Sequence, residues 1–260
     1  RCSVAEVGLP ADAVQFVEST DRALVMQMLQ MKDYLDLFVP RGGAELVRFV
    51  AENATMPAVT GGVGVCHAYV DESADLDAAR RIIVNAKVQR PTVCNALDCV
   101  LVHSSVASRL LKPLASELER AGVELHCDAR SLALVKQSGA TARALPATTE
   151  DWGKEYLSLT LAVKVVDSVD EALGHIEQYG SGHTETVLTE DYSVATRFLD
   201  EVDAGVVMVN ASTRFNDGSE FGLGAEVAIS TSKMHARGPL GLREMTSYKW
   251  VVQGSGQVRP

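Results

Sequence analysis

The chain has 260 residues, enough for one large or two ordinary domains around a buried core. It carries 24 basic and 34 acidic side chains, a formal net charge of −10. This balance argues against nucleic acid or an anionic membrane surface as a partner, because both require a basic face. No apolar run approaches the roughly 20 residues of a membrane span.

The first residues do not have the pattern of a signal peptide. They begin with Arg, and the stretch RCSVAEVGLP is typical of the end of a helix, so we expect further sequence before residue 1. The five cysteines are odd in number and scattered, unlike a disulfide framework. We therefore expect a reducing, cytoplasmic compartment.

Apolar runs alternate with stretches of helical spacing along the first third of the chain. The pattern predicts short strands over 13–17, 36–40 and 56–60, and helices over 21–31 and 42–52. A further strand and a helix ending near Gln89 follow. Strand, helix and strand in succession, with short connections, indicate a parallel, doubly wound α/β sheet.

The alternation continues through most of the remaining sequence. Strands are predicted over 99–103, 123–127, 159–166, 184–189 and 205–210, and helices over 104–121, 169–179 and 191–202. The stretch from 128 to about 150 is less regular, and the Gly-rich stretch 211–241 has little periodicity. A final strand is predicted over 245–253.

Two glycines, Gly42 and Gly43, stand between a predicted strand and a predicted helix, directly after Arg41. Helix N-terminal amides bind anions, and glycine lets a phosphate approach the backbone. The segment is therefore a candidate phosphate-binding turn. A plain turn with no ligand is the alternative.

Cys94 differs from the other cysteines because it lies in a polar stretch, QRPTVCNALDC, rather than in an apolar run. Cys66, Cys99 and Cys127 fall within predicted strands, and together with Cys2 they fit the usual reading of a free cysteine as a small buried side chain. The same structural role remains an alternative for Cys94. The Cys-His pairs at 66–67 and 126–127 lack the repeated close spacing of a zinc site, so no metal is expected.

Several longer motifs occur in order between about residues 8 and 252: VPRGG, VTGGVGVCHAYVDESADL, VNAKVQRPTVCNALD, VNASTRFNDGSEFGLGAEVAISTSKMHARGPLGL and TSYKW. Together they closely resemble the gamma-glutamyl phosphate reductases of proline biosynthesis, within the aldehyde dehydrogenase superfamily. The N-terminal portion of the family pattern is absent from the sequence.

The resemblance implies that Cys94 is a nucleophile. Its thiolate would displace phosphate from gamma-glutamyl phosphate to give a thioester, and hydride from NADPH would then yield glutamate 5-semialdehyde. The Cys94 backbone amide would be one donor to the oxyanion. Val59 stands where hydrolytic aldehyde dehydrogenases carry a water-activating glutamate, which fits reduction better than aldehyde oxidation. A glutamate there would be expected to promote thioester hydrolysis.

The resemblance also supplies candidate binding residues, each of which has a solvated charge or a surface ion pair as its alternative. The cofactor candidates are Arg41, Gly42, Gly43, Gly61, Gly62 and Glu155. The substrate candidates are Arg90, Asn95, Asn210, Ser212, Thr213, Arg214, His235 and Arg237. Arg90 is also expected to favour the Cys94 thiolate through its charge, and Arg214 to bind a substrate anion in a bidentate fork.

The implied organisation is the C-terminal part of an NADP-binding domain over 1–62, a catalytic α/β domain over 63–242 and an oligomerisation strand over 243–260. A homodimer or larger homo-oligomer is expected, with glutamate 5-kinase as a further candidate partner. Two alternatives stay open: the reductase half of a bifunctional kinase–reductase, or a folded but inactive module. If residues 1–260 are the whole polypeptide, NADPH affinity is expected to be very weak.

Overall fold

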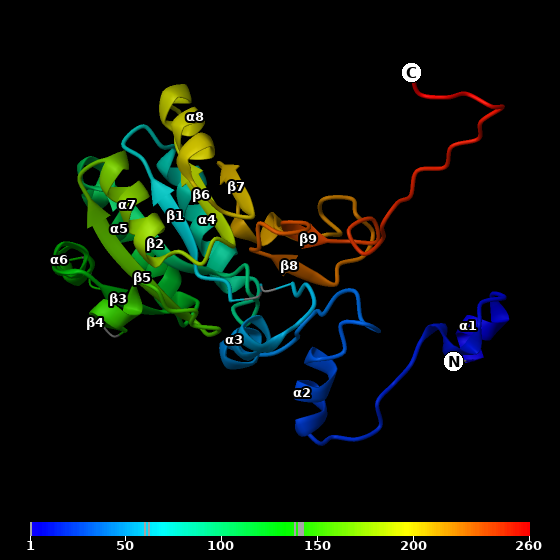
Figure 1. Ribbon diagram of the computed structural model, residues 1–260. Helices are drawn as coiled ribbons and strands as arrows, with labels where there is room; N and C mark the ends of the chain where they lie inside the picture. The colour runs from blue at the N-terminus through cyan, green and yellow to red at the C-terminus, as the bar shows by residue number, and fades with distance from the viewer. Residues whose placement is uncertain (1, 60, 62, 138, 140–142) are drawn as a thin grey trace.

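The computed structural model describes residues 2–59, 61, 63–137, 139 and 143–260, without the side chains of Cys2 and Ser3. Its centre is a sheet of seven parallel strands in the order β4-β3-β5-β2-β1-β6-β7 (Figure 1). The strands are β1 (Cys66–Val70), β2 (Leu97–His103), β3 (Glu124–Cys127), β4 (Ala144–Pro146), β5 (Thr160–Val166), β6 (Thr184–Leu188) and β7 (Val206–Val209).

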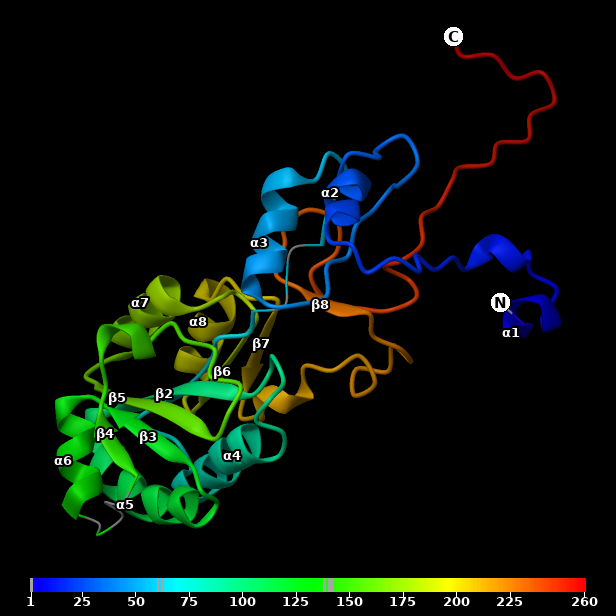
Figure 2. The ribbon, with the colours of Figure 1, turned by 90° about the horizontal axis from the view of Figure 1, so that it is seen from below.

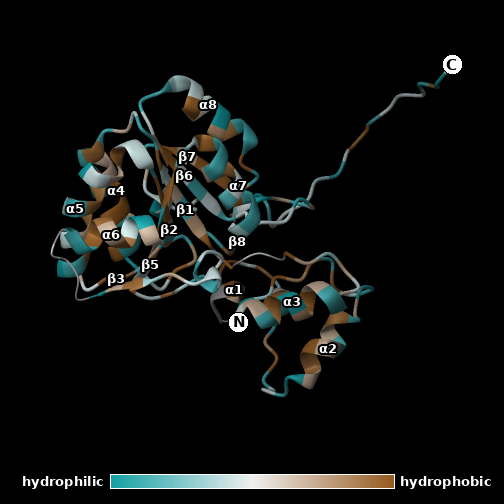
Figure 3. Cartoon of the chain, turned by 90° about the vertical axis from the view of Figure 1, so that its left-hand side faces the viewer, coloured by the Kyte–Doolittle hydropathy of each residue, from teal (hydrophilic) through white to brown (hydrophobic). Residues whose placement is uncertain are grey.

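Helices cover both faces of this sheet, as the alternating pattern predicted. One face packs against α4 (Leu76–Val88), α5 (Ser104–Arg120) and α6 (Ala129–Gln137), and the other against α7 (Val169–Tyr179) and α8 (Tyr192–Glu201). The strands are apolar along most of their length, while the helices turn polar surfaces outward (Figure 3). This is the pattern of a parallel sheet buried on both sides. The predicted α/β class is therefore confirmed.

The segments before β1 form a smaller unit beside the sheet. They contain α1 (Cys2–Glu6), a 3₁₀ turn at Ala11–Ala13, α2 (Ala23–Leu29) and α3 (Ala44–Asn53). Helices α2 and α3 pack against each other (Figure 2). The segments on either side of α3 contribute Leu37, Val39 and Val59 to a cluster with the antiparallel pair formed by β8 (Ala228–Ser230) and β9 (Gly238–Leu240). Two further 3₁₀ turns, at Thr149–Asp151 and Thr213–Phe215, complete the regular structure.

Four of the predicted strands form no ladder among the described residues of this chain. The role of 245–253 as an oligomerisation strand, which would pair it with a second subunit, stays a prediction. Residues 13–17 are exposed and irregular beyond Ala13, with Phe16 82% accessible. The stretches 36–40 and 56–59 meet only in a single bridge between Phe38 and Ala58; residue 60 lies outside the described part of the chain. Residues 245–253 form an extended, exposed tail that leaves the fold (Figure 1). A β-strand needs a neighbour to satisfy its backbone groups, so strand-forming composition alone is insufficient.

Regular structure also occurs where the sequence pattern was weak. Helix α6 and strand β4 occupy the stretch after residue 128, and β8 and β9 lie within 211–241. Among the described residues, no helix combines the length and the apolar character needed to cross a bilayer.

Candidate active site

Cys94 lies in the turn between α4 and β2, at the amino-terminal edge of the sheet. The loops that precede β1 and β5 meet it there and bring Gly61 and Glu155 to the same place. Ligands of open α/β sheets usually bind at the carboxyl ends of the strands. The candidate site therefore uses the opposite edge, which the general rule for this fold class does not anticipate.

A cavity of about 580 Å³ opens beside Cys94. Nine of the candidate residues line it: Arg41, Gly42, Gly43, Gly61, Arg90, Cys94, Asn95, Glu155 and Arg214. They come from the turn before α3, the loops before β1, β2 and β5, and the 3₁₀ turn after β7. The structure thus brings together residues that lie far apart in the sequence. The cavity wall carries three arginines together with three acidic side chains, Glu155, Asp217 and Glu226.

The Cys94 turn is held by a short chain of hydrogen bonds. The Thr213 hydroxyl donates to the Asn95 carbonyl at 2.7 Å, and the Asn95 amide nitrogen donates to the Asn216 carbonyl at 2.9 Å. Asn216 in turn donates to the Thr184 hydroxyl on β6 at 2.7 Å. Because Thr213, Asn216 and Thr184 are buried, these bonds fix the residue next to Cys94 against the sheet. Thr213 therefore positions the turn and does not face the cavity.

Backbone packing fixes Cys94 from its other side. An ideal Cβ on Gly64 would overlap the carbonyl oxygen of Cys94, so residue 64 has room only for hydrogen. The Cys66 thiol also donates to that carbonyl, at a sulfur–oxygen distance of 3.3 Å. Gly64 was not among the residues predicted from the sequence. The run of glycines at 61, 62 and 64 is the signal for it in the sequence.

Glu155 links the loops on the two sides of the cavity. Its Oε1 accepts a hydrogen bond from the Gly64 backbone amide at 2.9 Å. Burial raises the pKa of Glu155, and this hydrogen bond opposes the increase. Glu155 is therefore a fixed, half-buried acid on the cavity wall rather than a solvated surface charge.

The Cys94 thiol is protonated at neutral pH. Burial, reinforced by the negative charges of Glu155 and Glu226, raises its pKa to about 11, while Arg214 is the cation that lowers it. The sequence predicts this role for Arg90, whose side chain lines the same cavity. A thiol with this pKa needs a proton acceptor before it can act as a nucleophile.

Glu226 is a site residue that sequence analysis missed. It lines the cavity near Cys94, and its Oε2 accepts the Gly218 backbone amide at 2.8 Å. It lies in the Gly-rich stretch that showed no periodicity, directly before β8. Glu226 belongs to the FGLGAE motif, which marks it as a candidate in the sequence. Only the fold places that motif beside Cys94.

The remaining substrate candidates lie outside the lining of this cavity and have other contacts. Asn210 is at the carboxyl edge of the sheet, where its side chain bonds the backbone of Thr189. Ser212 caps the 3₁₀ turn at Thr213–Phe215. His235 contacts the Glu244 carbonyl at 2.6 Å, and Arg237 pairs with Asp203 at 2.6 Å. Their assignment as substrate ligands stays a prediction.

Three other sequence predictions bear on the site. Val59 is buried with Ala228 and Leu240 in an apolar cluster and is not part of the cavity wall. Cys66, Cys99 and Cys127 are buried free thiols, as expected. Gly62 and the side chain of Cys2 lie outside the described part of the chain.

Comparisons with known proteins agree with the resemblance found in the motifs. The model of the aldehyde dehydrogenase family matches residues 3–138 and 152–251. A gamma-glutamyl phosphate reductase of Dehalococcoides mccartyi is 56% identical over 100% of this chain and 61% of its own length. One from Roseiflexus castenholzii is 52% identical over 99% of this chain and 61% of its own length.

A solved structure supports the same relationship. The crystal structure of gamma-glutamyl phosphate reductase from Thermotoga maritima superposes with a TM-score of 0.93 at 49% identity, covering 99% of this chain and 61% of that one. The chain thus spans about 61% of the length of the curated relatives that it matches. With the family model matched over most of its length and the fold shared, the chain belongs to the aldehyde dehydrogenase family.

Proposed function

We propose that the chain carries the catalytic part of an NADPH-dependent reductase that converts gamma-glutamyl phosphate to glutamate 5-semialdehyde and phosphate in proline biosynthesis. The observation that carries the proposal is the position of Cys94 in a cavity lined by Arg41, Arg90 and Arg214. A half-buried thiol in a cavity that three guanidinium groups also line suits a substrate that is both an acylating agent and an anion.

Thioester formation at Cys94 requires no base from the protein. The sulfur attacks the acyl carbon, the bond from that carbon to the phosphate oxygen breaks, and the thiol proton passes to the departing phosphate. This route suits a thiol whose pKa is about 11, because the substrate itself supplies the proton acceptor. The backbone amide of Cys94 is the proposed donor to the developing oxyanion.

The charges on the cavity wall match those of the amino-acid portion of the substrate. Gamma-glutamyl phosphate carries an α-carboxylate and an α-ammonium group in addition to its phosphate. Arg214 and Arg90 are suited to the anionic groups, and Glu226 is suited to the ammonium group. The same arrangement orients the acyl carbon toward Cys94. When the α-carboxylate and the α-ammonium group are both bound, the position of the substrate's other end is restricted.

The residues beside the cavity also fit a dinucleotide cofactor. Gly43 precedes α3, a ten-residue helix, and an added Cβ there would meet no atom within 4 Å. The open backbone at this helix N-terminus, together with Arg41, provides donors for a phosphate group. Glu155 is the proposed partner of the ribose hydroxyls near the nicotinamide. When bound, reduced nicotinamide supplies the hydride that converts a thioester into an aldehyde.

The position that the resemblance assigns to a water-activating glutamate holds an apolar side chain. Val59 occupies that position in the resemblance, and its side chain is packed among apolar residues. Water activation at the thioester would divert it to glutamate, so an apolar residue there favours reduction. We propose a cytoplasmic location, a homo-oligomeric state and the catalytic domain over 63–242 on the strength of the family resemblance.

The reverse reaction tests this function. Purified protein is incubated with NADP⁺ and glutamate 5-semialdehyde, with and without inorganic phosphate, and NADPH formation is followed. We expect NADPH to accumulate only with phosphate, because phosphate must release the acyl group from Cys94. Phosphate-independent turnover would instead indicate a hydrolytic aldehyde dehydrogenase and would contradict the proposal.

A further inference from the structure

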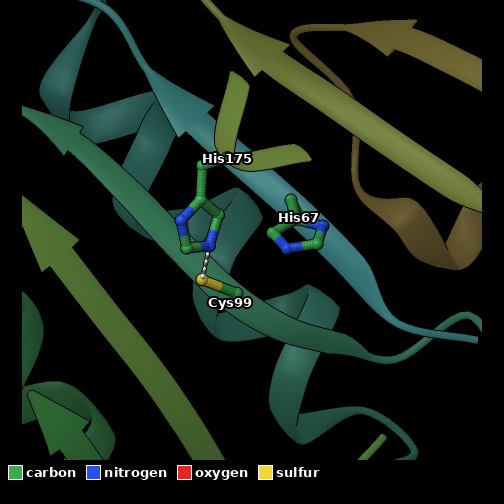
Figure 4. Close-up of side chains that lie close together, drawn as sticks. All are labelled: His67, Cys99 and His175. Carbon is green, nitrogen blue, oxygen red and sulfur yellow. Dashed lines mark hydrogen bonds between the residues drawn. The ribbon is translucent and has the colours of Figure 1, made fainter. Parts of the chain in front are cut away.

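Three metal-binding side chains meet in the core of the sheet, on the face covered by α7. His67 on β1 and Cys99 on β2 are direct neighbours in the parallel ladder, and His175 reaches them from α7 (Figure 4). One potential ligand atom from each lies within 4.8 Å of the other two. The Cys99 sulfur is 3.8 Å from His175 Nε2. The ladder register and the helix above it therefore bring together three residues that are far apart in the sequence.

The cluster is fully buried, and one of its nitrogens is unpaired. His67 and Cys99 are inaccessible, and His175 is 4% exposed. His67 Nε2 has no hydrogen-bond partner among the described residues. Buried polar atoms are almost always bonded, because leaving one unpaired costs about 1–3 kcal/mol. An unpaired imidazole nitrogen beside a thiol and a second imidazole is an arrangement that a ligand would satisfy.

The other nitrogen of His67 has the partner that metal-bound histidines usually have. His67 Nδ1 lies 3.0 Å from Glu185 Oε2 on β6, and Glu185 is itself buried. The carboxylate holds the proton on Nδ1, so the lone pair is on Nε2. A histidine that ligates a metal typically donates its second nitrogen to a carboxylate in this way, which fixes both ring orientation and tautomer.

We propose that His67, Cys99 and His175 form a binding site for a thiophilic divalent cation of the zinc type. Two imidazoles and one thiolate are a donor set that Zn²⁺ prefers, and three protein ligands leave a fourth coordination position. Binding breaks the Cys99 S–H bond, forms a sulfur–metal bond and releases the proton to solvent. The thiolate and Glu185 together then balance the two positive charges of the ion.

His175 must offer Nε2 to the cation, so its Nδ1 must carry the proton. Lys164 Nζ lies 3.3 Å from that Nδ1 and also 3.6 Å from Glu171 Oε1. With the site filled, Lys164 would keep Glu171 as its partner and withdraw from the imidazole. The alternative occupant is a water molecule bonded to His67 Nε2, which requires no change at His175 or Lys164.

An acidic surface cavity and the cluster share one neighbour, Glu185. A cavity of about 630 Å³ lies between α7 and α8, and Glu185 forms part of its wall together with Asp170, Glu177, Glu201 and Asp203. Acidic walls concentrate cations. Arg197 also lines this cavity and pairs with Asp170 and Glu201. Glu185 thus belongs both to this acidic cavity and, through His67, to the cluster.

Cobalt substitution tests the site directly, because Co²⁺ bound to a thiolate has an intense charge-transfer absorption. Purified protein is treated with a chelator, dialysed, and titrated with Co²⁺ and then with Zn²⁺, while bound metal is counted by mass spectrometry of the folded protein. We expect one equivalent of Co²⁺ with the thiolate band, and displacement of that band by Zn²⁺. A folded wild-type protein that shows no thiolate band would overturn the proposal and favour the bound water.

Matched variants show which cysteine thiol binds the metal ion. Cys99→Ala should abolish the thiolate band and weaken Zn²⁺ binding by more than about 100-fold, since it removes a direct ligand. Cys127→Ala removes another buried thiol outside the cluster, and Cys94→Ser removes the thiol of the candidate active site. Both should bind as the wild type does. If Cys94→Ser loses the band and Cys99→Ala retains it, the metal binds at Cys94 and the proposal is wrong. His175→Gln provides the same test if Cys99→Ala does not fold.

Discussion

The backbone of Gly64 lies directly against the carbonyl oxygen of Cys94, with no space for a β-carbon between them. The glycine before β1 therefore sets the position of the turn before β2. Since the Glu155 carboxylate accepts the amide of the same glycine at 2.9 Å, three loops of the candidate site are joined at this residue.

Gly64→Ala should displace the Cys94 turn. The added methyl must push aside backbone, so we expect a loss of about 1–3 kcal/mol in the free energy of unfolding and slower alkylation or turnover at Cys94. Gly174→Ala is the matched control: it lies inside α7, and its β-carbon would meet nothing within 4 Å. That variant should gain about 0.5–1 kcal/mol from better helix propensity. Urea titrations of both variants measure the difference, and equal stability of the two would contradict the packing argument.

The reactivity of Cys94 should depend on the acidic groups around it. Only the thiolate is alkylated, so the iodoacetamide rate should rise with pH toward the thiol pKa of about 11. Glu226 raises this pKa, and Arg214 lowers it. Glu226→Gln should therefore speed alkylation at pH 8, and Arg214→Gln should slow it.

Glu190→Gln is the control for this charge effect, because Glu190 is exposed and follows the carboxyl end of β6. It should leave the alkylation rate unchanged. Equal rates for the wild type, Glu226→Gln and Arg214→Gln would show that the two groups do not act on Cys94.

Glu226 should also favour the proposed substrate, glutamate 5-semialdehyde, by binding its α-ammonium group. Losing a charge-assisted hydrogen bond costs about 1.5–3 kcal/mol, so Glu226→Gln should raise KM for glutamate 5-semialdehyde by about 10- to 100-fold. The five-carbon analogue without the amino group is the control substrate, and the wild type and variant should handle it alike. A similar loss on both substrates would mean that Glu226 supports the fold of the cavity instead.

Val59→Glu should destabilise the protein rather than promote thioester hydrolysis. The side chain is 4% exposed and packs with Ala228 and Leu240, so a carboxylate there would be buried without a partner. We expect a cost of at least about 3 kcal/mol, measured by urea unfolding. Val59→Leu keeps the apolar character and should cost less than half as much. A Val59→Glu protein of wild-type stability would indicate that residue 59 faces the cavity.

Apart from α6 and β4, the strand–helix alternation from β1 to β7 was predictable, because most of its strands contain apolar runs and its helices have an apolar stripe. The predictions failed at both ends of the chain, where 13–17 and 245–253 have the composition of strands but no partner among the described residues. Composition indicates which segments prefer an extended conformation, and only the fold determines whether a neighbouring strand is available.

The residues of the candidate site also form two groups, those that could be selected from the sequence and those that depend on the fold. Cys94, Arg41, Arg90, Glu155 and Arg214 could be selected from local sequence and resemblance, and the fold places them around one cavity. Gly64 and Glu226 could not, because their importance comes from contacts with distant segments. The neighbouring positions of His67 and Cys99 depend on the ladder register, which periodicity does not specify.

Trapping the acyl group on Cys94 tests the role of this residue as the nucleophile. Purified protein is mixed with gamma-glutamyl phosphate, generated in place by a glutamate kinase, without nicotinamide cofactor, and then examined by intact mass and peptide mapping. We predict one glutamyl adduct on Cys94, released by hydroxylamine as expected of a thioester, absent from Cys94→Ser and retained in Cys127→Ser. An adduct on another residue, or an unchanged adduct in Cys94→Ser, would contradict the account.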